Sequence, residues 1–208
     1  MRKLCWLFLL LLLTPRAALA GLLYDEAASG DLSNDGLSPT QLGSLQDGDN
    51  VVYGTTGRVV ATDRDYFTFT VPQGLVWSQL LELPGTQVGG SVSFIGLQAG
   101  PQVTVSPNAS DATGLLGWAH YGASTVADIE LLSVMGTAGL GSTGFTPPLP
   151  AGVYSVWIQD FGGGTFSYGF DFHLTPAAPE PTAAPFALFG VALVASVRSA
   201  RSRRTSSR

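Results

Sequence analysis

In the stretch DYFTFTV, residues 65–71, large apolar side chains recur at every second position, so that they would share one side of an extended chain. One side carries Phe67, Phe69 and Val71, and the other carries Tyr66, Thr68 and Thr70. A period of two is typical of a β-strand, because successive Cβ atoms point to opposite faces of the pleat. Residues 72–74, Pro-Gln-Gly, then favour a turn. The stretch therefore predicts a strand with an aromatic core face.

Two later runs repeat this alternation. GVYSVWIQD, residues 152–160, places on one side Tyr154, Val156 and Ile158. TFSYGFDFHL, residues 165–174, places on one side Phe166, Tyr168, Phe170, Phe172 and Leu174. The intervening FGGG, residues 161–164, predicts a hairpin in which the two strands pair. We expect their aromatic faces to pack on a second sheet, each fully buried large side chain contributing about 1.5–3 kcal/mol.

Weaker alternation and β-branched residues indicate further strands. These are VVYGT (51–55), VWSQLLEL (76–83), SVSFIGLQ (91–98), PQVTV (101–105) and part of ADIELLSV (127–134). Helical periodicity is scarce. About eight short strands separated by glycine-rich turns predict an all-β fold, a β-sandwich or jelly roll, over residues 21–175.

The N-terminus has the layout of a secretory signal peptide over residues 1–20. Arg2 and Lys3 precede an apolar run over residues 4–13, and the segment closes with Ala-Leu-Ala at 18–20. This pattern predicts a signal helix cleaved between Ala20 and Gly21. The alternative is an uncleaved anchor, but ten apolar residues are well short of the roughly 20 that span a bilayer.

Charge is distributed very unevenly along the chain. All fifteen acidic residues and only two arginines, Arg58 and Arg64, lie between residues 21 and 181, so that part has a formal charge of −13 although the whole chain has −5. Such a body repels phosphate backbones, which excludes nucleic acid as a partner. The single cysteine, Cys5, is in the predicted leader, so the core alone must hold the mature domain.

The C-terminus combines three features in order. A Pro/Ala linker over residues 176–182 contains Pro179, Glu180 and Pro181, and an apolar stretch over residues 183–197 precedes five arginines. This order resembles the PEP-CTERM sorting signal, which implies recognition and removal by a membrane protease of the exosortase class.

The physical chemistry of the tail agrees with that resemblance. Fifteen helical residues extend about 22 Å, less than the roughly 30 Å of a hydrocarbon core. The arginines would stay on the cytoplasmic side, and the two prolines would keep the tripeptide extended and accessible. Residues 183–208 are therefore expected to form a marginal transmembrane helix with a basic tail; a permanent weak anchor is the alternative.

The body carries a second resemblance. YDEAASGDLSNDG (24–36), DRDYFTFTVPQG (63–74), LPAGVYSVWIQD (149–160) and YGFDFHL (168–174) are similar to the bacterial pre-peptidase C-terminal domain family. Residues 101–150 depart from the family pattern. The resemblance implies a compact β-sandwich that accompanies secreted enzymes or stands alone, sometimes binds calcium or polymeric substrates, and is rarely catalytic.

The sequence offers little for catalysis. No Gly-x-Ser-x-Gly occurs, and the histidines are only His120 and His173, the latter on the polar side of its run and expected to face solvent. The pairs Asp47/Asp49 and Asp63/Asp65 are spaced to share a strand face, but aspartate is common at turns. We expect no enzyme activity; a secreted hydrolase with an unrecognised carboxylate site is the alternative.

No cofactor is expected except calcium. DLSNDG, residues 31–36, begins like an EF-hand loop, but its twelfth position is Leu42, where a bidentate glutamate is required. A looser site could gather Glu26, Asp31, Asp63 or Asp65 as oxygen ligands, as the family resemblance allows.

These features together predict a secreted, non-catalytic protein of the cell surface or extracellular matrix. Its expected partners are signal peptidase, an exosortase-type protease, the membrane during transit, and polysaccharide or a surface protein. Three aromatic residues are expected to be exposed and to stack on sugar: Tyr66, Trp118 and Trp157.

Overall fold

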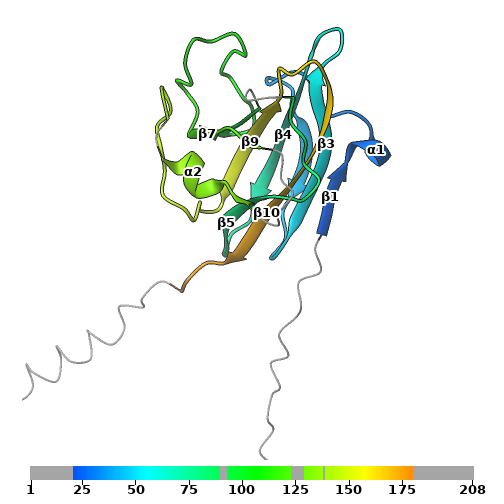
Figure 1. Ribbon diagram of the computed structural model, residues 1–208. Helices are drawn as coiled ribbons and strands as arrows, with labels where there is room; N and C mark the ends of the chain where they lie inside the picture. The colour runs from blue at the N-terminus through cyan, green and yellow to red at the C-terminus, as the bar shows by residue number, and fades with distance from the viewer. Residues whose placement is uncertain (1–20, 90–92, 123–128, 138, 180–208) are drawn as a thin grey trace, which may run out of the picture. The chain divides into compact units, whose positions relative to one another are not determined.

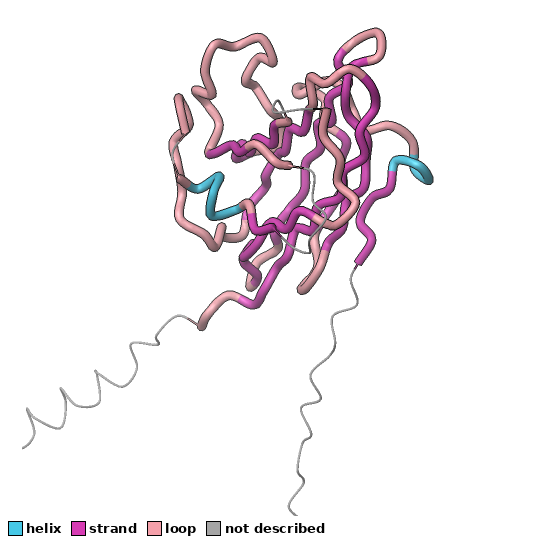
Figure 2. Tube along the Cα trace, viewed as in Figure 1, coloured by secondary structure: helices cyan, strands magenta, loops and turns pink. Residues whose placement is uncertain are grey.

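The computed structural model describes residues 21–89, 93–122, 129–137 and 139–179. These residues are mainly β-structure (Figure 2), with two short helices, α1 (Glu26–Ser29) and α2 (Leu132–Gly136). The strands are β1 (Gly21–Asp25), β2 (Thr40–Ser44), β3 (Asn50–Arg58), β4 (Thr62–Val71), β5 (Leu75–Glu82), β6 (Phe94–Ala99), β7 (Gly117–Ala119), β8 (Ile129–Glu130), β9 (Gly152–Gln159) and β10 (Gly164–Pro176). The predicted all-β class is confirmed. The predicted terminal helices, within residues 1–20 and 183–208, lie outside the described residues.

The strands form one curled sheet in the order β7-β6-β9-β4-β3-β10-β5-β8 (Figure 1). Neighbours along this path pair antiparallel, whereas β1 joins β3 and β2 joins β4 in parallel. Strands β3 and β4 pair only at Gly57 with Asp63 and at Arg58 with Thr62. This narrow junction separates the β4 half of the sheet (β7-β6-β9-β4) from the β10 half (β3-β10-β5-β8).

The core takes aromatic side chains from both halves. Phe69 on β4 packs edge-on against Trp77 on β5 and Phe172 on β10, with ring centroids 5.3 and 5.2 Å apart. The predicted core faces of β4 and β9 are confirmed, because the following are all buried: Phe67, Phe69, Val71, Tyr154, Val156 and Ile158. The predicted face of β10 is buried from Tyr168 to Leu174, whereas Phe166 at its start is half-buried and outside the core.

The predicted hairpin between residues 152–160 and 165–174 is wrong. Strand β9 pairs with β4 and β6, whereas β10 pairs with β3 and β5. The physical reason lies at Asp160, whose buried carboxylate accepts hydrogen bonds from the backbone N–H groups of Gly162 and Gly89. These bonds fix the glycine segment as a crossing from one half of the sheet to the other.

One of the weaker strand predictions also needs correction. Residues 101–105 form no strand: Val103 is buried, but its backbone N–H bonds to Gly36 in a loop contact. In the stretch 127–134, part of which was predicted to be a strand, Ile129 and Glu130 form β8. Helix α2 then begins at Leu132, because the Glu130 carboxylate accepts hydrogen bonds from the first backbone N–H groups of the helix. Strands β1, β2 and β7 were not predicted.

The junction between the two halves depends on a glycine. Gly57 has φ of 141°, and a Cβ at this position would overlap the carbonyl oxygen of Gly164. We expect Gly57→Ala to lower the free energy of unfolding by about 1–3 kcal/mol, measured by urea denaturation. Gly74→Ala is the control, since Gly74 has φ of 85° but no atom within 4 Å of an added Cβ. Equal losses in the two variants would contradict a specific role of the junction.

Candidate functional site

Three of the four acids predicted as cation ligands meet beside the start of β4. Carboxylate oxygens of Glu26, Asp31 and Asp65 lie within 4.8 Å of one another. Glu26 begins α1, Asp31 follows that helix, and Asp65 lies in β4. We call these three residues the acidic site. The alternation that buries Phe67 and Phe69 also turns Asp65 inward, because Asp65 shares their face of the strand.

Glu26 is held firmly by backbone groups. Its Oε1 accepts a hydrogen bond from the Leu32 N–H at 2.9 Å, and its Oε2 accepts one from the Thr55 N–H at 2.7 Å. Burial raises the pKa of the Glu26 carboxyl, these two bonds oppose the rise, and Asp31 adds to it. The carboxylate therefore has a fixed direction, as a metal ligand requires.

Asp65 is the most unusual group of the acidic site. It is fully buried, its Oδ2 accepts a hydrogen bond from the Tyr168 hydroxyl at 2.7 Å, and its Oδ1 has no partner among the described residues. Burial, followed by the charge of Glu26, raises the pKa of Asp65 well above its ordinary value. A buried carboxylate oxygen without a partner is costly, and a cation would satisfy it.

The fourth predicted ligand, Asp63, lies outside this group. Its Oδ1 accepts a hydrogen bond from the Asn34 side-chain amide at 3.1 Å, and burial raises its pKa. The donor set of the acidic site is thus three carboxylates. Hard cations such as Ca²⁺ prefer oxygen donors, so Glu26, Asp31 and Asp65 fit that class of metal.

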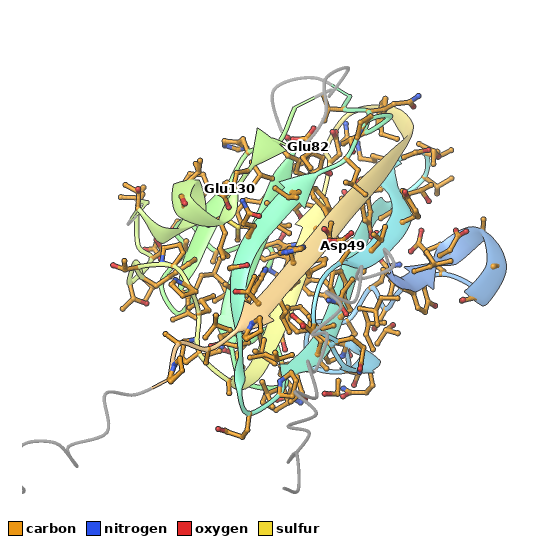
Figure 3. All side chains as sticks on the ribbon, turned by 90° about the horizontal axis from the view of Figure 1, so that it is seen from below. Asp49, Glu82 and Glu130 are labelled. Carbon is orange, nitrogen blue, oxygen red and sulfur yellow. The ribbon has the colours of Figure 1, made fainter. Side chains whose placement is uncertain are left out.

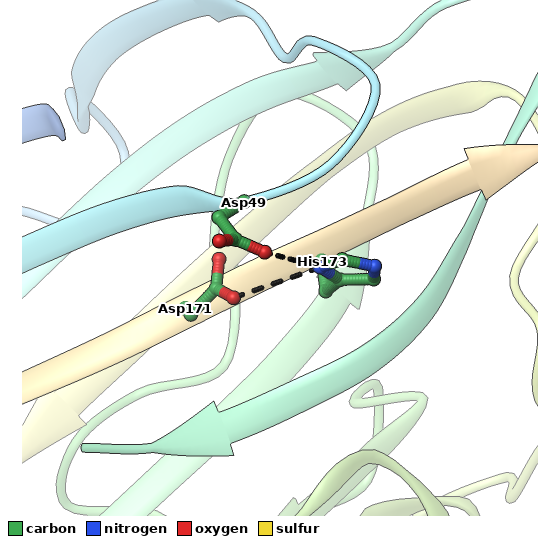
Figure 4. Close-up of side chains that lie close together, drawn as sticks. All are labelled: Asp49, Asp171 and His173. Carbon is green, nitrogen blue, oxygen red and sulfur yellow. Dashed lines mark hydrogen bonds and ion pairs between the residues drawn. The ribbon is translucent and has the colours of Figure 1, made fainter. Parts of the chain in front are cut away.

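A second cluster joins Asp49, Asp171 and His173 (Figure 4). Nδ1 of His173 lies 2.6 Å from Oδ1 of Asp49 and 3.8 Å from Oδ2 of Asp171. Burial is the main cause that raises the pKa of Asp171 to about 6, and a hydrogen bond from the Asn50 N–H opposes it. The expectation that His173 simply faces solvent is wrong: its side chain is half-buried and paired, which ties β10 to the start of β3.

The remaining labelled acids in Figure 3 serve the fold. Glu82 on β5 is buried, its Oε2 accepts a hydrogen bond from the Gly122 N–H at 3.3 Å, and burial raises its pKa. Glu130 on β8 caps α2. Asp49, also labelled there, belongs to the cluster with His173, while Asp47 is exposed. His120 is exposed, and its Nδ1 contacts the Ser93 carbonyl oxygen.

The predicted exposure of three aromatic residues is largely wrong. Tyr66 is 2% and Trp157 5% exposed, and Trp118 is half-buried. They lie on the face of the β4 half opposite the main core, where Val103 and Leu115 from the covering loop are buried against Tyr66 and Trp157. The sequence showed large aromatic residues on that face but contained no periodic signal for the loop above them.

The predicted processing residues fall at the ends of the described chain. Gly21 begins β1, and Pro179 lies in exposed irregular chain after β10. Ala20, Glu180 and Pro181 lie outside the described residues, as does the apolar tail. In the part of the chain that the structure describes, no helix is long and apolar enough to cross a membrane.

Phe94 and Tyr168 were not predicted from the sequence as site residues. Phe94 packs against Trp118 and Trp157, and Tyr168 bonds to Asp65. Tyr168 could be recognised only as a core aromatic, because nothing local marks its bond to a residue 103 positions away. No protein-family model matches the chain, and no curated protein matches it either.

Proposed function

We propose that this chain is a secreted protein of the cell surface or extracellular matrix, delivered by its signal peptide and processed at its C-terminal tail. The observation that carries the proposal is the charge distribution. Positive charge concentrates at the two ends, and the part between residues 21 and 181 carries −13. Basic residues on the cytoplasmic side and an acidic body outside agree with the positive-inside rule.

The body is proposed to be a non-catalytic β-sandwich that binds polysaccharide or a neighbouring surface protein. The two halves of the curled sheet share one aromatic core, as facing sheets of a sandwich do.

We further propose that the acidic site holds a calcium ion that stabilises this body. Glu26 begins the first helix and Asp31 follows it, whereas Asp65 belongs to strand β4. A cation bound by all three would fasten the N-terminal segment, which begins at the predicted cleavage site, to the core. The unpartnered Oδ1 of Asp65 supports this assignment.

Processing is tested by changing the tail. We expect a variant with alanine at Pro179, Glu180 and Pro181 to accumulate as a longer, membrane-associated form, while the natural chain is shortened at both ends. Mass spectrometry of both proteins from a host with an exosortase-type protease measures the termini. Recovery of the natural chain from the cytosol with both ends intact would overturn the proposal.

A further inference from the structure

Four aromatic side chains form a continuous row across the β4 half, on the face opposite the main core. They come from four neighbouring strands, β7, β6, β9 and β4, and are Trp118, Phe94, Trp157 and Tyr66. Successive ring centroids lie 5.9, 4.7 and 5.6 Å apart, and the first and last pairs are stacked. We call this row the aromatic ladder.

The ladder is covered at one end and open at the other. Val103 and Leu115 are buried against it, and Tyr66 and Trp157 are almost fully buried. Phe94 and Trp118 are only half-buried. The accessible part of the ladder is therefore the end formed by β6 and β7.

A cavity of about 420 Å³ lies at this open end. Phe94, Trp118 and Trp157 supply its aromatic wall, and Asp111 and Gln159 are among its polar lining residues. Its volume is within the range of about 300–1,000 Å³ that is usual for small-molecule sites. Apolar wall and a few polar groups together are typical of a binding site rather than of a packing gap.

The polar groups around the cavity determine the ligand class. Gln159 accepts a hydrogen bond from Arg64 Nε at 3.1 Å, which fixes its amide in the wall. Asp111 is exposed on the loop and offers a carboxylate. Amide and carboxylate groups bind hydroxyls, and the lining residues contain neither lysine nor arginine.

The two tryptophans of the ladder also have unused hydrogen-bonding capacity. The indole N–H groups of Trp118 and Trp157 are buried without a partner among the described residues. Tryptophan N–H groups in a purely structural core usually find an acceptor.

We infer that the cavity at the open end of the aromatic ladder binds one pyranose unit of a neutral polysaccharide. The apolar C–H groups of the sugar pack against the uncovered parts of the Trp118 and Phe94 rings in the cavity wall, and its hydroxyls bond to Asp111 and Gln159. A uronic acid or sulfated sugar is disfavoured, because its charge meets a body of formal charge −13. The inference rests on the proposed surface function, since it names the ligand that the body would bind there.

The test is a fluorescence titration of the full-length chain with soluble neutral glucan, galactan and chitin oligosaccharides and with an oligouronate. At least one neutral oligosaccharide is expected to change tryptophan emission saturably, and the oligouronate is expected to bind at least about tenfold more weakly. Trp118→Ala is expected to weaken neutral binding about tenfold or more, and Trp118→Phe to retain most of it.

Two further variants keep the test decisive. Tyr53→Ala, at a 43% exposed aromatic residue on the β10 half, is the control and should bind as the natural chain does. If Trp118→Ala fails to fold, Asp111→Asn on the exposed loop decides, with a severalfold weaker affinity expected. No saturable emission change with any neutral oligosaccharide overturns the inference. Unchanged affinity in a folded Trp118→Ala variant or in Asp111→Asn also overturns it, as does an equal loss in Tyr53→Ala. Sugar binding by a chain found unprocessed in the cytosol would refute only the proposed location.

Discussion

Phe69→Ala is expected to lower the free energy of unfolding by about 3–5 kcal/mol. Phe69 is 2% exposed, and its ring lies within 6.5 Å of four other aromatic rings in the core. Those rings are Phe67, Trp77, Tyr154 and Phe172. They come from β4, β5, β9 and β10, so the cavity left by the substitution would loosen both halves of the sheet at once.

Denaturant titration with matched melting curves measures this loss. For a domain of this size a loss of about 3–5 kcal/mol corresponds to a melting temperature roughly 10 °C lower. Phe161→Ala is the control, because it removes the same side chain from a loop position that is 38% exposed. This substitution should lower the free energy of unfolding by less than about 1 kcal/mol. A similar loss in both variants would mean that the ring cluster does not hold the two halves together.

The alternation of residues 65–71 predicted β4 and its buried face because burial of one side of a strand leaves a local trace. Phe67 and Phe69 had to share a face whatever their partners were. The same reasoning identified the core faces of β9 and β10. These predictions depended only on the geometry of an extended chain, in which the side of each residue follows from its position in the sequence.

Strand partners were not predictable in this way. The FGGG segment is compatible with a hairpin, and what prevents one is the bond from Gly89 N–H to the Asp160 carboxylate, 71 residues away. The parallel additions β1 and β2 likewise depend on distant partners in β3 and β4. Such long-range contacts leave no periodicity in the segment that makes them.

For the candidate sites, too, the sequence indicated single residues but not the contacts between them. Glu26, Asp31 and Asp65 were predicted, with Asp63, as oxygen ligands that the family resemblance allows. Their meeting within 4.8 Å could not be derived, since it depends on β1 lying beside β3. The burial of Trp157 depends on an irregular loop over residues 101–116, and no periodic pattern in the sequence predicts where that loop packs.

Millimolar calcium is expected to raise the melting temperature of the natural chain by about 5–10 °C. Ligand at about 100 times its dissociation constant adds about 2.7 kcal/mol, and each kcal/mol is worth about 2–4 °C in a domain of this size. The physical reason is the repulsion among Glu26, Asp31 and Asp65, together with the unpartnered Oδ1 of Asp65. Magnesium should act more weakly, because it demands octahedral geometry and holds its water tightly.

The calcium effect should also depend on pH in a defined direction. The pKa values of Glu26 and Asp65 are raised in the fold, so without metal these groups favour folding at low pH, and that contribution is lost as pH rises through their folded pKa values. Calcium binds the ionised carboxylates and displaces the protons. The rise in melting temperature is therefore expected to be larger at pH 7.5 than at pH 5.

Asp65→Asn separates a bound cation from a general effect of salt. The amide keeps the shape of the side chain and an acceptor for Tyr168 but removes one charged ligand, so the melting temperature without calcium should be equal or higher and the rise with calcium should disappear. Asp49→Asn is the matched control, because Asp49 belongs to the other acidic cluster and its loss should leave the calcium response intact. A full calcium response in Asp65→Asn, or no response in the natural chain, would show that the three carboxylates do not bind calcium. The unpartnered Oδ1 of Asp65 would then be a destabilising feature of the core that no cation offsets.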